Sequence, residues 1–90
     1  MIRRDMEFLD FCKTQVAKYT NAHTDATDHA DPITEEDVFV VWYAKTLQNW
    51  KGLFSTTRFD GMYYEVTVNG DKEEAYLDAY KKVSNEVIKI

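Results

Sequence analysis

The sequence predicts a single small α+β domain in which a helix, a three-stranded antiparallel meander and a second helix follow one another. Both terminal segments repeat apolar residues every three or four positions, as amphipathic helices do. Between them, residues 38–68 are rich in β-branched and aromatic side chains, which favour strands. A chain of 90 residues has room for one hydrophobic core, so residues 1–90 are expected to form one domain.

The first helix is expected within residues 1–19. Its apolar stripe contains Ile2, Met6, Leu9, Cys12, Val16 and Tyr19. Such a stripe is more typical of a helix that packs on a core than of one that binds a partner. Cys12 is therefore expected to be buried and unreactive. As the single cysteine it excludes an internal disulfide, which fits a reducing compartment.

Residues 20–34 are expected to form a polar, acidic loop because they show no apolar periodicity. The loop contains side chains that bind divalent metals in other proteins: His23, Asp25, Asp28, His29 and Asp31. Nothing in their spacing fixes a coordination geometry, and such residues are common in solvated loops. The preferred interpretation is a solvated loop with no metal site and no cofactor.

Residues 35–68 form the predicted sheet block. Thr34 precedes three acidic residues, which indicates a helix N-cap followed by a single helical turn. Three strands are then expected, at residues 38–47, 50–57 and 62–68. Gly61 favours a turn before the third strand because glycine tolerates a positive φ. The main alternative is a helix over residues 35–51.

The second helix is expected at residues 71–89. Tyr76, Tyr80, Val83 and Val87 recur at spacings of four, three and four. Acidic residues at the start of this segment and lysines near its end suit the helix dipole. The two helices are expected to cover one face of the sheet and to leave the other face partly open.

Charge and composition exclude several functions. The net charge of −5 disfavours binding to duplex DNA, which depends on neutralising phosphates. The chain has no apolar run of membrane-spanning length and no secretory signal, so a cytoplasmic protein without membrane contact is expected. It has no glycine-rich phosphate loop and no recognisable nucleophile with its base, so no catalytic residues are assigned.

A ligand site is predicted within the sheet block. The candidate residues offer positive charge, hydrogen-bond donors and aromatic rings, and they are Lys45, Asn49, Trp50, Lys51, Ser55, Arg58 and Tyr63. This combination suits a small phosphorylated nucleotide, whose base stacks on a ring. The alternative is that Trp42 and Trp50 belong to the core and that the lysines lie on an ordinary solvated face.

The runs VVWYAKTLQNWKGLFSTT and DGMYYEVTVNGDKEEAYLDAYKK resemble a family of small uncharacterised proteins from phages and prophages of Gram-positive bacteria, which is catalogued as a domain of unknown function. The resemblance covers residues 35–88. It implies an accessory protein that acts inside an infected cell, and it assigns no site residues.

These observations lead to the expectation of a non-enzymatic phage protein that counteracts host defence by sequestering a small nucleotide signal. The alternative is an inhibitor that binds a host protein or imitates nucleic acid. In that case the acidic side chains would carry the function: Asp25, Asp28, Asp31, Glu35 and Glu36. A homo-oligomer is expected because so small a core supplies limited stability.

Overall fold

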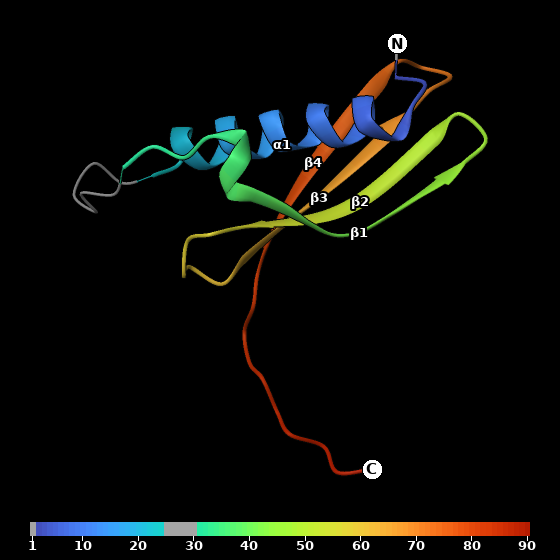
Figure 1. Cartoon of the computed structure of the whole chain (residues 1–90). Coiled ribbons are helices and arrows are strands. Elements are labelled where there is room, and N and C mark those ends of the chain that lie inside the picture. The colour runs from blue at the N-terminus through green and yellow to red at the C-terminus, as the bar shows by residue number, and fades with distance from the viewer. Residues whose placement is uncertain (1, 25–30) are drawn as a thin grey trace.

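The computed structural model describes residues 2–24 and 31–90, and it places one helix on one side of a four-stranded antiparallel sheet (Figure 1). Helix α1 spans Asp5–Ala22 and the 3₁₀ turn η2 spans Glu35–Asp37. The strands are β1 (Val38–Thr46), β2 (Asn49–Thr56), β3 (Met62–Asn69) and β4 (Glu74–Lys81). They lie in the order β1-β2-β3-β4, so the sheet is a simple meander. The single α+β domain, the N-terminal helix and the first three strands are confirmed.

The core lies between α1 and the central strands. From the helix, Phe8, Cys12 and Val16 have no exposed surface. The sheet opposes them with large side chains, which are Trp50, Phe54, Tyr64, Val66 and Val68. The expectation that the helical stripe packs on a core, with Cys12 buried, is confirmed except at Met6, whose side chain is 66% exposed.

The turn η2 joins the N-terminal segment to the sheet. Glu36 donates its backbone N–H to Thr34 Oγ1, and the backbone N–H of Thr34 donates to Asp37 Oδ2. This reciprocal capping satisfies donors that a helix start leaves free. The helix then stops after one turn because Val38 already pairs with Thr56 of β2. The single turn is confirmed, and the alternative helix over residues 35–51 is wrong.

The predicted helix at residues 71–89 is wrong. Residues 74–81 form β4, which pairs with β3 from Asn69↔Glu74 to Met62↔Lys81. The sequence EAYLDAYK alternates as well as a strand requires, so its spacing suited both structures. Eight residue pairs with β3 favour the strand conformation over the helix for this segment. Beyond it, residues 82–90 form neither helix nor strand, and they run away from the body of the protein (Figure 1).

The pairing register divides the sheet side chains between two faces. Directly paired residues in an antiparallel sheet point to the same side. Trp50, Phe54 and their partners therefore face α1. Between Val40 and Trp42 the register shifts, and the extra residue Val41 forms a bulge. The opposite side, which we call the open face, carries Phe39, Trp42, Lys51, Tyr63, Glu65, Tyr76, Asp78 and Tyr80.

Candidate binding face

The open face is rich in exposed aromatic side chains. Phe39 and Trp42 of β1 are 49% and 44% exposed, and Tyr76 and Tyr80 of β4 are 50% and 51% exposed. Tyr63 of β3 pairs with Tyr80 and adds a further aromatic side chain beside β4. Aromatic side chains dominate the energetics of protein interfaces, and large exposed apolar patches mark interaction surfaces.

The centre of the open face carries more negative than positive charge. Lys51 Nζ lies 3.4 Å from Glu65 Oε1, so the lysine is already paired. Glu65 is also the direct cross-strand partner of Asp78. Two carboxylates therefore face one ammonium group, and a phosphate placed here would meet net repulsion.

The structure does not gather the seven sequence-predicted ligand residues into one place. Lys51 and Tyr63 lie on the open face. Ser55 is on the same side of its strand but is buried, and its hydroxyl donates to the backbone carbonyl of Met62 at 2.9 Å. Asn49, two residues before Lys51 in β2, is on this side as well, so four of the seven share one side of the sheet.

Trp50, Lys45 and Arg58 lie away from that side, and the side chain of Asn49 is held at the edge of the sheet. Trp50 is 2% exposed and stacks on Phe8 in the core. Lys45 lies on the helix side, with its Nζ 5.3 Å from the centre of the Trp50 ring. The side chain of Asn49 accepts the backbone N–H of Gly70 at the hairpin turns. Arg58 lies in the loop after β2 and is described next.

Arg58 borders a small pocket of about 210 Å³ at the C-terminal end of α1. Its guanidinium donates to Thr24 Oγ1 and to the backbone carbonyl of Asp31. The rings of Tyr19 and His23 stack beside it with centroids 3.9 Å apart. The pocket therefore combines a fixed cation with an imidazole and an aromatic platform.

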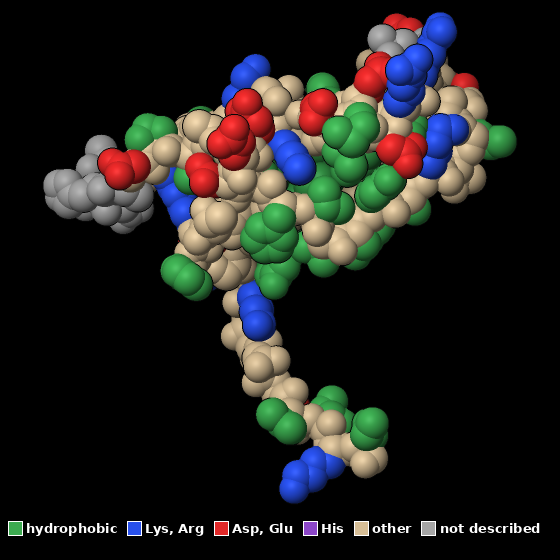
Figure 2. Space-filling view, viewed as in Figure 1, with side chains coloured by type: hydrophobic (Ala, Val, Ile, Leu, Met, Phe, Trp, Pro, Cys, Tyr) green, Lys and Arg blue, Asp and Glu red, His purple; other side chains and the backbone are tan. Residues whose placement is uncertain are grey.

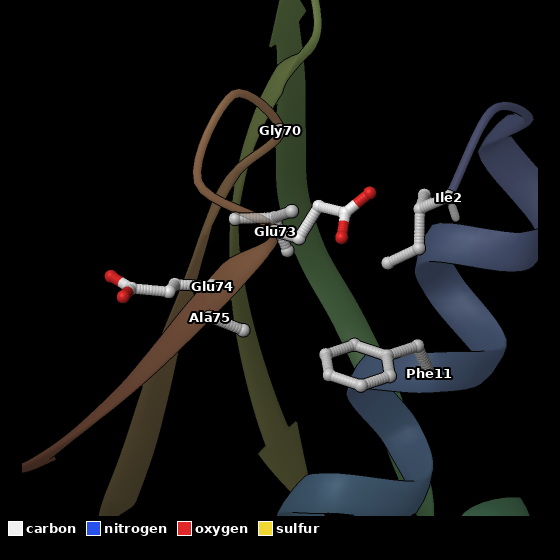
Figure 3. A pocket seen from close by; sticks show the side chains of 7 residues that line it. Ile2, Phe11, Gly70, Glu73, Glu74 and Ala75 are labelled. Carbon is white, nitrogen blue, oxygen red and sulfur yellow. The ribbon is translucent and has the colours of Figure 1, made fainter.

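A larger pocket of about 390 Å³ lies between the start of α1 and the β3–β4 turn. In Figure 3, Ile2 and Phe11 face Ala75 and Glu73 across this space. The lining is apolar apart from Glu73 and Glu74. Sequence reasoning missed this pocket because it placed residues 71–89 in a helix.

Comparison with protein families gives one match. The model of a family of unknown function, DUF6275, matches residues 9–90. The chain belongs to this family. No curated protein and no solved structure matches it. The match includes β4 and residues 82–90, so the C-terminal segment belongs to the DUF6275 domain and not to an unrelated extension.

The described part of this DUF6275 structure shows neither a metal-ligand cluster nor a membrane-spanning helix. Across residues 2–24 and 31–90, no three histidine, cysteine or acidic side chains cluster as a metal site requires. Asp25, Asp28 and His29 of the predicted loop lie outside those ranges. In the same described part of the chain, no helix has both the length and the apolar character needed to cross a membrane.

The thiol of Cys12 is buried in the core. Burial raises the pKa of its thiol from 9.0 to about 12, so the reactive thiolate is essentially absent near neutral pH. This DUF6275 chain therefore uses Cys12 as a core residue.

Proposed function

We propose that this DUF6275 chain is a non-enzymatic accessory protein of phages or prophages that binds a host protein through its open face. The observation that carries the proposal is the row of exposed aromatic side chains on a sheet face that α1 leaves uncovered. Each of the two edge strands contributes a pair of them, Phe39 with Trp42 and Tyr76 with Tyr80.

The chemistry of the face favours a protein partner over a nucleotide. Trp42 and Tyr80 offer large rigid apolar surfaces, each with one hydrogen-bonding group, as interface anchors do. Glu65 of β3 and its partner Asp78 of β4 lie near Tyr80 and suit lysine or arginine side chains of a partner. A phosphorylated ligand at the centre of the open face would meet Lys51, which Glu65 already pairs.

The proposed origin in phages or prophages rests on the sequence resemblance, and it indicates that the partner is a protein of the bacterial host. In this proposal the protein acts by occupying a surface on a host protein. Counteracting a host defence protein is the form of this role that we propose.

The proposal is tested by affinity purification from a lysate of a Gram-positive host, with the full chain as bait. Trp42→Ser and Tyr80→Ser remove anchors from the open face without touching the core. Phe59→Ser is the matched control, because Phe59 is fully exposed in the β2–β3 loop, outside the open face. We expect one host protein to be retained by the wild type and by Phe59→Ser, and to be lost with the two open-face variants. Equal retention by all four proteins would contradict the proposal.

A second candidate function keeps the nucleotide hypothesis but moves it to Arg58. The guanidinium lies beside the stacked rings of Tyr19 and His23, a combination that suits a phosphate joined to a base. The pocket is small, so only part of a nucleotide would enter it.

Thermal melting against a panel of linear and cyclic nucleotides separates the two functions. A ligand at about 100 times its dissociation constant adds about 2.7 kcal/mol to the free energy of unfolding. A shift that Arg58→Gln abolishes and Lys51→Gln preserves would favour nucleotide binding over the open-face proposal. No shift with any nucleotide would remove this second candidate.

A further inference from the structure

Strand β4 lies at the edge of the sheet, and within residues 2–24 and 31–90 no strand pairs with its outer side. Its eight residues contain no proline, and its register with β3 has no bulge. Leu77 alone among its side chains is partly buried. Proteins usually block such long, regular edges because the free N–H and C=O groups pair readily with another strand.

Residues 82–90 continue β4 and expose an unusual amount of apolar surface. The side chains of Val83, Val87, Ile88 and Ile90 are each exposed by 80% or more. Figure 2 shows hydrophobic and basic side chains on this segment standing clear of the rest of the molecule. β-Branched residues favour strands, so the segment has the composition of a strand that lacks a partner.

The path of the chain takes this segment away from its own sheet (Figure 1). Lys82 donates its backbone N–H to the carbonyl of Gly61 at 2.7 Å, which extends the direction of β4 by one residue. The sequence KKVS at positions 81–84 contains no glycine, proline, asparagine or aspartate to turn the chain back on its own sheet.

We propose that residues 83–90 of one protomer form a strand that pairs antiparallel with β4 of a second copy of this chain. The pairing is reciprocal, since each copy supplies its residues 83–90 and the outer edge of its β4, as a two-fold dimer requires. Residues 83–90 suffice to span the eight residues of β4, and this match places the two-fold axis near Lys82. The two sheets then join into one.

The charges and the apolar pocket at the Glu74 end of β4 support residues 83–90 of a second copy as the strand that pairs there. With the axis at Lys82, Lys89 lies opposite Ala75, on the side of the apolar pocket between Ile2 and Phe11 (Figure 3). Glu73 borders the same pocket, with its carboxylate directed toward Ile2, and suits the ammonium group of Lys89. Val87 then lies opposite Leu77, the partly buried side chain of β4.

Sedimentation of the full chain tests the proposal. We expect the wild type to behave as a dimer of the 10.6 kDa chain. Val87→Asp should raise the dimer dissociation constant at least about 30-fold, which corresponds to about 2 kcal/mol. Phe59→Asp, the matched control in the β2–β3 loop, should leave it unchanged. A monomeric wild type, or equal dimerisation of both variants, would overturn the proposal. The Val87 side chain is 88% exposed, so its replacement should not unfold the protomer.

Cross-linking tests the position of the axis. Lys82 uses its N–H within its own sheet, so two opposed copies form a non-hydrogen-bonded pair, with Cα atoms about 4.5 Å apart. Lys82→Cys should therefore oxidise to a disulfide-linked dimer, while Lys72→Cys in the β3–β4 turn should stay monomeric under denaturing conditions. A disulfide-linked dimer in both variants, or in neither, would contradict this pairing.

The same register places Glu86 opposite Asp78, a repulsive pair. Glu86→Gln should therefore tighten the dimer, and weaker association of this variant would contradict the register.

Discussion

The rings of Phe8 and Trp50 stack with their centroids 5.0 Å apart and their planes 17° from parallel. Phe8 comes from the first turns of α1 and Trp50 from the start of β2, so this contact fixes the helix on the sheet. Phe8 also contacts Phe54, at a centroid distance of 6.2 Å. The open face exists because α1 is held on the other side by these rings.

Phe8→Ala should lower the free energy of unfolding by about 3 to 5 kcal/mol, because the side chain is fully buried and leaves a cavity against Trp50. Urea unfolding followed by circular dichroism measures the change. The control is Met6→Ala in the same helix, where the side chain is 66% exposed and the loss should stay below about 1 kcal/mol. Equal losses in the two variants would mean that α1 does not pack through Phe8.

Gly70→Ala should destabilise the protein by about 3 kcal/mol. A Cβ at Gly70 would lie 2.1 Å from the backbone oxygen of Gln48, so the β1–β2 and β3–β4 turns would have to separate. The side chains of Gln48 and Asn49 also bond across this contact, to Asp71 and to the Gly70 N–H. Thermal and urea unfolding measure the loss.

A second variant identifies the clashing atom at Gly70. Gln48→Gly removes the Cβ and Cγ that also approach Gly70, but it leaves the carbonyl oxygen in place. The double variant should therefore remain as unstable as the sum of the two single changes. Recovery of stability in the double variant would assign the clash to the Gln48 side chain.

The strands that the sequence predicted correctly are those with an unambiguous pattern. Residues 62–68 alternate cleanly, and Gly61 marks their start with a φ of 70°. Residues 74–81 satisfy both the helical and the strand period, and local propensity alone does not decide between them. Pairing with β3 decides, and the paired residues lie five to nineteen positions away in the chain.

The candidate site was harder to predict than the strands. Lys51 and Tyr63 were placed correctly on one face because strand alternation fixes their side. Lys45 and Trp50 were grouped with them by composition, but their paired positions in β1 and β2 turn both toward α1. The aromatic residues of β4 were missed, since a helix would have placed Tyr76 and Tyr80 on a different surface.

The side chain of Asn21, near the end of α1, bonds to the backbone of Ile33. Its side-chain amide donates to the carbonyl of Ile33 at 2.8 Å and accepts the N–H of Ile33 at 2.9 Å. Asn21→Ala removes both bonds and should cost about 1 to 2 kcal/mol. Limited proteolysis should then cut faster between Ala22 and Pro32. Lys18→Ala, one turn earlier on an exposed site, serves as the control and should leave both measurements unchanged.

The last prediction concerns the pH dependence of stability. Burial raises the pKa of Cys12 from 9.0 to about 12, so the folded protein keeps a proton that the unfolded chain releases above pH 9. Stability from the neutral thiol is therefore fully present below pH 9 and is lost as the pH rises toward 12. Between pH 8 and pH 10 the loss should reach about 1.4 kcal/mol.

Cys12→Ala isolates this contribution from the tyrosines, which also titrate at high pH. The variant is less stable at pH 8 because it loses packed volume in the core. The difference in unfolding free energy between wild type and variant should then shrink as the pH rises from 8 to 10, since only the wild type carries the thiol. Urea unfolding at several pH values provides the comparison. A difference that stays constant over this range would mean that Cys12 is accessible to water in the folded protein and ionises there as it does in the unfolded chain.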